Sequence, residues 1–158
     1  DSILNHYANI VSNKFTNNVS MQPSTGAAGG MGYSFLAFLG AELKSGINTV
    51  LETLDFNQYL SDADLVITGE GRIDAQSDRG KAPIGVINYA KNHKCSIFVI
   101  AGSIQDSEAF IKKYGVNEAY SIVSRELSLE DALEHPTENL IAISRLAAKD
   151  FKKNYADT

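Results

Sequence analysis

The sequence has very little cysteine, and this scarcity excludes several classes of protein. Cys95 is the single cysteine of the chain, so no intramolecular disulfide can form. A structural zinc site is also disfavoured, because such sites usually draw on several thiolates. We expect Cys95 to be a small buried side chain at the edge of a strand.

Long apolar runs and an excess of positive charge are missing as well. No apolar run approaches the roughly 20 residues that span a bilayer, and the first residues do not have the pattern of a signal peptide. The net charge of −5 disfavours non-specific binding to nucleic acid, which needs clustered Lys and Arg. The sequence therefore predicts a cytoplasmic protein with neither a nucleic-acid nor a membrane partner.

Apolar residues are plentiful enough for a folded core. The chain has 158 residues, of which 44% are hydrophobic, as is typical of one ordinary domain or of a small domain with part of another. It begins without methionine and inside an apolar pattern of helical spacing over residues 2–14. We therefore expect the chain to be a fragment of a longer polypeptide.

A glycine-rich segment follows the first predicted helix. Residues 26–32 read GAAGGMG, and a helical pattern over residues 33–39 comes directly after them. Glycines permit positive φ angles and close approach of the backbone, so Gly29 and Gly30 are candidates for binding a substrate or nucleotide. Small residues also let helices pack closely, and this alternative explains the same segment.

The second part of the chain alternates between strand and helix patterns. Short apolar runs rich in β-branched residues occupy residues 64–67, 96–101 and 119–123, and helix-length segments follow them at residues 81–92, 106–114 and from 128 onward. This βαβαβα order predicts an α/β fold with a parallel, Rossmann-like sheet. We expect residues 1–61 to be a largely helical part of a second, inserted α/β domain, and residues 62–158 to be the carboxyl-terminal portion of the Rossmann-like domain.

The segment Thr68–Asp74, TGEGRID, is the main candidate for chemistry. We expect a turn at the exit of the first strand, where ligands bind in open α/β sheets, with Gly69 and Gly71 shaping the backbone. Arg72 can grip a carboxylate or phosphate and Lys81 a second anionic oxygen. Glu70 and Asp74 supply two carboxylates, and each can act as a base or as a magnesium ligand. An ion pair that only stiffens the turn is the alternative.

A second strand exit carries a smaller version of the same pattern. Ala101, Gly102 and Ser103 follow the second apolar run, so Gly102 and Ser103 are candidates for lining a nucleotide or phosphate pocket. A tight turn between strand and helix is the alternative. The sequence contains no G-x-x-x-x-G-K-[ST] loop and no well-placed dinucleotide fingerprint, so a nucleotide would have to be held in another way. It also contains no G-x-S-x-G elbow, so a hydrolase triad has no support.

Three segments resemble the carboxyl-terminal part of the bacterial type 1 glycerate kinase family. They are residues 26–47, residues 62–86 with TGEGRID followed by GKAP, and the AGS sequence at residues 101–103. The resemblance implies two α/β domains around a cleft and phosphorylation of glycerate by ATP with Mg²⁺. It further implies that the amino-terminal part of the same polypeptide, absent from this chain, supplies the other half of the cleft.

The leading hypothesis is therefore an ATP-dependent glycerate kinase. In it, Arg72 holds the substrate carboxylate or the phosphate, Lys81 neutralises developing charge, and Glu70 or Asp74 is the base or the metal ligand. One alternative is a non-catalytic binding or structural module, because half of the cleft is absent. Another is a Rossmann-type domain that uses a different nucleotide cofactor.

Overall fold

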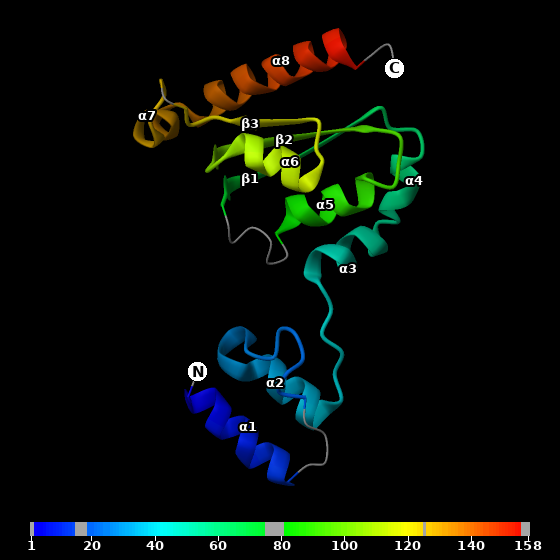
Figure 1. Ribbon diagram of the computed structural model, residues 1–158, viewed down its shortest axis with the longest axis vertical. Coiled ribbons are helices and arrows are strands. Elements are labelled where there is room, and N and C mark those ends of the chain that lie inside the picture. Colours follow the sequence, from blue (N-terminus) through cyan, green and yellow to red (C-terminus); the bar gives the residue numbers. More distant parts are fainter. Residues whose placement is uncertain (1, 15–18, 75–80, 125, 156–158) are drawn as a thin grey trace. The chain divides into compact units, whose positions relative to one another are not determined.

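The structure of the protein is a computed structural model that describes residues 2–14, 19–74, 81–124 and 126–155 (Figure 1). The chain divides into two compact units, Asp1–Ser45 and Gly46–Thr158. Each unit has its own packing, and the two are described in turn. No helix among the described residues is both long and apolar enough to cross a bilayer.

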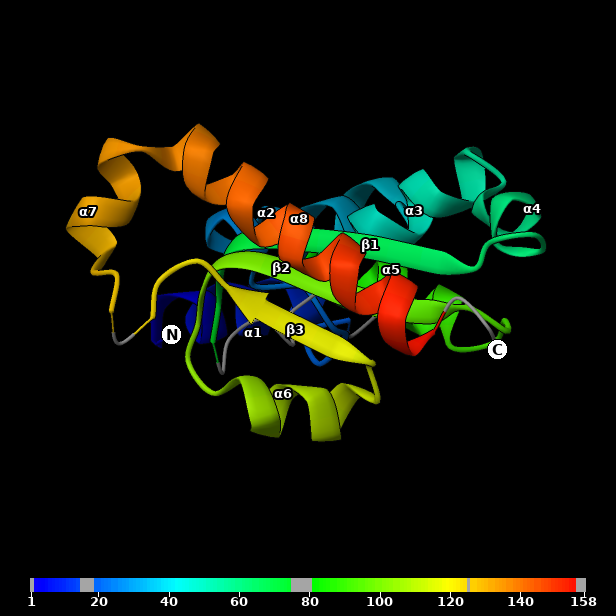
Figure 2. The same cartoon turned by 90° about the horizontal axis from the view of Figure 1, so that it is seen from above.

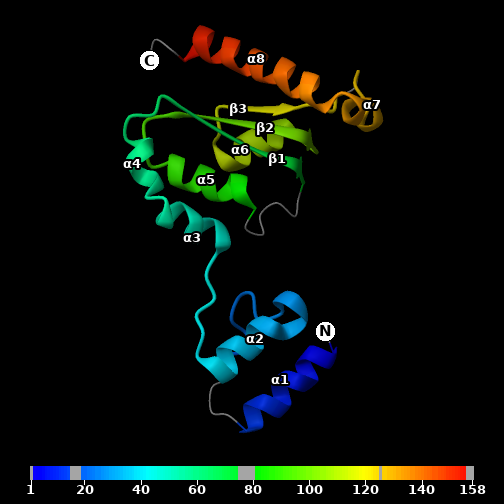
Figure 3. The ribbon, with the colours of Figure 1, turned by 180° about the vertical axis from the view of Figure 1, so that it is seen from behind.

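The first unit consists of two helices, α1 (Ser2–Lys14) and α2 (Ala27–Leu39) (Figure 3). Tyr7 joins them, because its hydroxyl hydrogen-bonds the Ser34 hydroxyl at 3.0 Å and its ring packs edge-on against the Tyr33 ring with centroids 5.6 Å apart. Val11 and Tyr33 are buried in this contact. The helix predicted over residues 2–14 is confirmed with the same bounds.

The glycine-rich segment forms a distorted first turn of α2. Ala28, Gly29 and Gly30 have left-handed backbone angles, with φ of 50°, 68° and 93°. The predicted positive φ angles are therefore present, and these three non-helical residues form a kink before the regular part of α2. Gly40, also left-handed with φ 60°, ends the helix by donating its N–H to the Phe35 carbonyl oxygen.

The second unit is built on a parallel sheet of three strands in the order β1-β2-β3. The strands are β1 (Leu65–Ile73), β2 (Ser96–Ile104) and β3 (Glu118–Ser121), and α5 (Ala82–Ala90) and α6 (Ser107–Tyr114) connect them. The remaining helices are α3 (Gly46–Thr53), α4 (Phe56–Leu60), α7 (Leu129–Glu134) and α8 (Pro136–Asn154). Helices α5 and α6 lie on one face of the sheet and α8 on the other (Figures 1 and 2). The predicted Rossmann-like α/β arrangement is confirmed.

Helices α3 and α4 pack with the sheet unit. The Ile47 side chain of α3 occupies the space beside Gly85 of α5, and the Phe56 ring lies 6.4 Å from the Tyr89 ring. Leu60, at the end of α4, is 2% exposed and belongs to the core. The boundary between the compact units thus lies between Ser45 and Gly46 in the sequence. The sequence predicts a domain boundary at 61–62, and the assignment of residues 1–61 and 62–158 to two domains stays a prediction.

The core lies on both faces of β2, whose side chains alternate between them. Val99 is completely buried on the face that α5 covers, in a cluster with Val66 and Ile87. Phe98 is completely buried on the opposite face, where its ring contacts those of Phe151 and Tyr155 at centroid distances of 6.1 and 5.5 Å. A strand buried on both faces is typical of a parallel sheet covered by helices.

Specific residues mark the starts of α5 and α7. Pro83 lies in the first turn of α5, where its missing N–H has no helical acceptor to lose. The Ser128 hydroxyl accepts the Asp131 N–H at 3.1 Å and donates to the Asp131 carboxylate at 2.6 Å, which caps α7.

The two turns expected at strand exits are wrong. Thr68–Ile73 is not a turn but the second half of β1, and Ala101–Ser103 lies inside β2. The pairing of the two strands continues through both segments, with Glu70 opposite Ala101 and Arg72 opposite Ser103. Glycine lets the two strands approach closely at these positions. A Cβ added to Gly69 would collide with the Ile100 carbonyl oxygen, and a Cβ added to Gly102 would collide with the Gly71 carbonyl oxygen.

Candidate functional site

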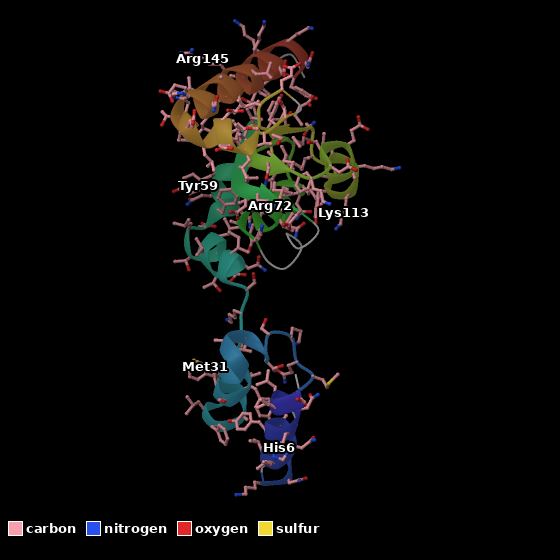
Figure 4. The ribbon with its side chains drawn as sticks, turned by 90° about the vertical axis from the view of Figure 1, so that its left-hand side faces the viewer. His6, Met31, Tyr59, Arg72, Lys113 and Arg145 are labelled. Atoms are coloured by element: carbon pink, nitrogen blue, oxygen red, sulfur yellow. The ribbon has the colours of Figure 1, made fainter. Side chains whose placement is uncertain are left out.

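Arg72 and Asp74 lie together at the carboxyl end of β1. The Arg72 Nε atom is 3.4 Å from the Asp74 Oδ2 atom, and the two side chains are 73% and 24% exposed. A surface ion pair of this kind contributes only about 0–1 kcal/mol to stability. Most of the guanidinium faces solvent (Figure 4), so its remaining N–H groups can bind an anion.

Lys81 joins this pair from the segment just before α5. Its Nζ atom donates a hydrogen bond to the backbone carbonyl oxygen of Arg72 at 2.8 Å. The ammonium has three N–H donors, so this bond leaves two for a ligand. Two cations and one carboxylate therefore meet at the end of β1, as the sequence predicted, and we refer to Arg72, Asp74 and Lys81 as the β1-end cluster.

Glu70 borders a different space from the β1-end cluster. Its Oε1 atom accepts the N–H of Gly71 at 3.1 Å. The residue lines a hollow of 530 Å³ between the sheet and α8, whose other borders include Ile67, Gly102 and Leu140. We call this space the α8 hollow.

Asp74 lines a second hollow, of 290 Å³, on the other side of the strand ends. Its apolar borders come from β1, β2 and α6 and include Ile73, Ile104 and Phe110. We call this space the α6 hollow. The two candidate carboxylates thus face separate spaces, and Asp74 is the one that pairs with Arg72.

The candidate glycines of the sheet and Ser103 lie on the paired strands between these hollows. Gly69 and Gly102 line the α8 hollow, and Gly71 is exposed with open space around it. Ser103 is the pairing partner of Arg72 on β2 and is half-buried. The structure therefore brings Ser103 beside the β1-end cluster, whereas Gly102 belongs with Glu70.

Gly29 and Gly30 lie in the first unit. They line a hollow of 470 Å³ together with Met31 and Ser34 of α2 and residues of α1. Met31 is 52% exposed beside this opening (Figure 4). The left-handed backbone at Ala28–Gly30 is the kind of conformation found at ligand sites, and the binding role of both glycines stays a prediction.

The carboxylates were also tested as a metal site. Among the described residues, no three His, Cys, Asp or Glu side chains are grouped so that they could hold a metal ion. Magnesium in phosphoryl-transfer sites commonly takes only one or two protein carboxylates, with phosphate oxygens and water as its other ligands. Asp74, beside two cations that suit phosphate, fits such a partial set.

Sequence reasoning missed Gln105 and Asp106, which border the α6 hollow. The signal that could have identified them is their position, because they follow β2 directly and precede α6. Asp106 also caps α6, with its Oδ1 atom accepting the Ala109 N–H at 2.9 Å.

Comparison with known proteins assigns the family. The model of the glycerate kinase family matches residues 1–152 of the chain. The chain belongs to the glycerate kinase family. This confirms the family suggested by TGEGRID and GKAP, and it makes the β1-end cluster part of a glycerate kinase fold.

Proteins similar to this chain are named as glycerate kinases. The chain is similar to Glycerate 2-kinase of Escherichia coli K12, with 42% identity over 145 residues that make up 92% of this chain and 38% of that protein. It is 41% identical to Glycerate kinase of Bacillus subtilis over 96% of this chain and 40% of that protein. A crystal structure assigned to glycerate kinase 2 of Salmonella typhimurium LT2 superimposes with a TM-score of 0.68 and 38% identity, over 97% of this chain and 39% of that one. The chain thus spans about 40% of the length of these relatives, which agrees with the expectation of a longer polypeptide.

Proposed function

We propose that the polypeptide containing this chain transfers a phosphoryl group from ATP to a hydroxyl of glycerate. The observation that carries the proposal is the β1-end cluster, in which two cations and one carboxylate meet at a strand end in a chain of the glycerate kinase family. The names of the relatives favour this function over a non-catalytic module, because they match over most of the chain.

The cluster offers the groups that phosphoryl transfer requires. Arg72 is exposed enough to bind the carboxylate of glycerate or a phosphate with two parallel N–H donors. Lys81 is held in place through the Arg72 carbonyl oxygen and presents a point charge to a phosphate oxygen. These two cations would stabilise the negative charge spread over the oxygens of the phosphoryl group in transfer.

Asp74 is the proposed acid of the site. Its carboxylate is one-quarter exposed next to Arg72, where it can accept the proton of the attacking hydroxyl or serve as a magnesium ligand. Asp74 would hold Mg²⁺, which would supply positive charge that neutralises part of the charge of the phosphates. Glu70 borders the α8 hollow instead, so we assign it a secondary role behind Asp74.

The proposal is tested with the natural-length polypeptide that contains this chain, in an assay coupled to ADP release. We expect ADP release that depends on glycerate, and we expect Asp74→Asn to lower kcat by about 10²-fold or more, because the amide can neither accept the proton nor ligate Mg²⁺ well. The control is Asp62→Asn, the same change at an exposed residue before β1.

Two results would contradict the proposal in different ways. Absence of glycerate-dependent ADP release from the unchanged protein would remove the activity itself. An Asp74→Asn variant with the rate of the Asp62→Asn control would remove the role of Asp74 and leave the activity in place.

A further inference from the structure

The α6 hollow is suited to a flat, uncharged ring. Its floor is apolar, with Ile73 and Phe110 only 3% and 6% exposed. The rings of Phe110 and Tyr114 lie with their centroids 4.6 Å apart, so both border the same space. Together with Ile73 and Ile104 they give the hollow an apolar wall, against which the flat apolar faces of a nucleobase can pack.

The charges around the α6 hollow disfavour a small anion there. Two carboxylates border it, Asp74 and Asp106, against one ammonium, that of Lys113. The Lys113 Nζ atom lies 5.0 Å from the centre of the Tyr114 ring, a cation–π contact that partly satisfies the ammonium. A glycerate carboxylate or a free phosphate therefore finds less positive charge in this hollow than at Arg72 and Lys81.

Asp106 supplies a specific acceptor at the rim. Its Oδ1 atom accepts the Ala109 N–H at the start of α6, and its Oδ2 atom has no hydrogen-bond donor among the described residues and can accept one from a ligand. An exocyclic amino group of a purine is such a donor. Gln105, exposed beside Asp106, offers both an acceptor and a donor for the same edge of a base.

Position and size agree with this chemistry. The hollow lies at the carboxyl ends of β1 and β2, where ligands of open α/β sheets bind. Asp74 belongs both to its border and to the β1-end cluster, so the hollow adjoins the two cations through this residue. The volume of 290 Å³ is close to the lower limit of about 300 Å³ for small-molecule pockets, which suits a base more than a whole nucleotide.

We propose that the α6 hollow binds the purine base of the nucleoside triphosphate donor, with Phe110 and Tyr114 on the apolar border of the ring and Asp106 accepting its amino group. The proposal rests on the proposed function, which supplies the nucleotide. The base then has its own site in the α6 hollow, while the phosphates and glycerate depend on the cations of the β1-end cluster.

Filling the hollow tests its occupant. Ala109 borders the hollow from the exposed side of α6, so Ala109→Leu adds bulk to it without changing the buried core. The control is Lys112→Leu, the same new side chain at an exposed position of the same helix that does not border the hollow. In the natural-length polypeptide, we expect Ala109→Leu to raise the calorimetric Kd for ADP and for adenosine by about tenfold or more, and Lys112→Leu to leave both unchanged.

A second variant tests base recognition and retains the helix cap. Asn caps helices about as well as Asp, and in Asp106→Asn the amide oxygen is needed by the Ala109 N–H, which puts the amide nitrogen in place of Oδ2. We expect the unchanged protein to bind adenosine several-fold more tightly than purine riboside, which lacks the 6-amino group. In Asp106→Asn this preference should disappear, because the amide N–H₂ of the new side chain and the 6-amino group of adenosine are both hydrogen-bond donors.

The outcomes separate this inference from the proposed function. ADP binding that Ala109→Leu does not weaken, or equal affinity of the unchanged protein for adenosine and purine riboside, would overturn the base site even if glycerate is phosphorylated. Loss of ADP and adenosine binding in Ala109→Leu, in a protein that does not turn over glycerate, would support the base site and reject the proposed acceptor.

Discussion

At the scale of single residues, Gly69 and Gly102 determine how closely β1 and β2 can pair. Neither has a positive φ; each lies where a side chain would collide with a backbone carbonyl oxygen of the neighbouring strand. Backbone atoms cannot move aside as the end of a flexible side chain can, so this restriction is strict. The same pairing keeps Arg72 opposite Ser103 and thereby fixes the position of the Arg72 backbone in the candidate site.

This restriction predicts different effects for two glycines of the same strand. Gly69→Ala should lower the free energy of unfolding by about 1–3 kcal/mol, because the new methyl group forces β1 and β2 apart. Gly71→Ala is the matched control, since an added Cβ there meets open space, and we expect a change within about 0.5 kcal/mol. Urea unfolding followed by circular dichroism measures both. Equal losses in the two variants would mean that the close approach at Gly69 does not limit the pairing.

At the scale of elements, α8 is fastened to the sheet by aromatic rings and two hydrogen bonds. Tyr120 of β3 donates its hydroxyl to Asp150 of α8 at 3.0 Å, and Tyr155 after α8 donates to Glu118 of β3 at 3.1 Å. Both phenols have raised pKa values, mainly because burial disfavours the phenolate and further because the neighbouring carboxylates repel it. The folded state therefore prefers both tyrosines protonated.

This preference predicts a loss of stability in alkali. A group whose pKa is raised on folding stabilises the protein fully below its unfolded pKa, about 10 for tyrosine, and loses that contribution as the pH rises toward the folded value. We expect the free energy of unfolding to fall as the pH increases above about 10, and the fall to be shallower in a Tyr120→Phe, Tyr155→Phe double variant, which keeps the rings and cannot ionise there. Urea unfolding at a series of pH values measures the slope.

The control for the alkaline slope is Tyr59→Phe, because the Tyr59 side chain is 65% exposed (Figure 4). It should leave the slope close to that of the unchanged protein. A double variant with the unchanged slope as well would show that α8 is not fastened through these phenols.

The elements themselves could be predicted from the sequence, but the lengths of two strands could not. Apolar periodicity identified α1 and the alternation of strands with helices, because the spacing of buried side chains is a local property. Gly69, Gly71 and Gly102 predict strand ends, since glycine usually interrupts a strand. What keeps them inside β1 and β2 is a carbonyl oxygen on the neighbouring strand, and such a contact cannot be identified from the residues next to glycine in the sequence.

The candidate site was predictable to a similar extent. Arg72, Asp74 and Lys81 were expected together and are together, because they are near in sequence and follow one strand. Glu70 was grouped with them, yet it borders the α8 hollow, since pairing carries the strand through it and leaves it short of the strand end. The α6 hollow was not predicted, because residues of β1, β2 and α6 form it jointly.

At the scale of the whole molecule, the boundary between the two units depends on α3 and α4. Sequence composition changes near Asp62, where the strand patterns begin, and this change led to the predicted boundary at 61–62. The packing of Ile47 beside Gly85 and of Phe56 against Tyr89 instead connects residues 46–61 with the sheet unit. Composition follows the type of secondary structure, whereas a compact unit is defined by contacts.

Two shortened chains distinguish these boundaries. We expect residues 46–158 to unfold cooperatively in urea, and residues 62–158 to be less stable by at least about 2 kcal/mol, because the shorter chain lacks Leu60, which is 2% exposed in the core, and truncating one buried Leu already costs about 2–5 kcal/mol. Leu60→Ala in the longer chain should reproduce a large part of this loss, while Leu54→Ala, at a residue 57% exposed in the same segment, should cost little. Equal stability of the two shortened chains would instead favour a boundary at 61–62, because α3 and α4 would then contribute nothing to the folding of the sheet unit.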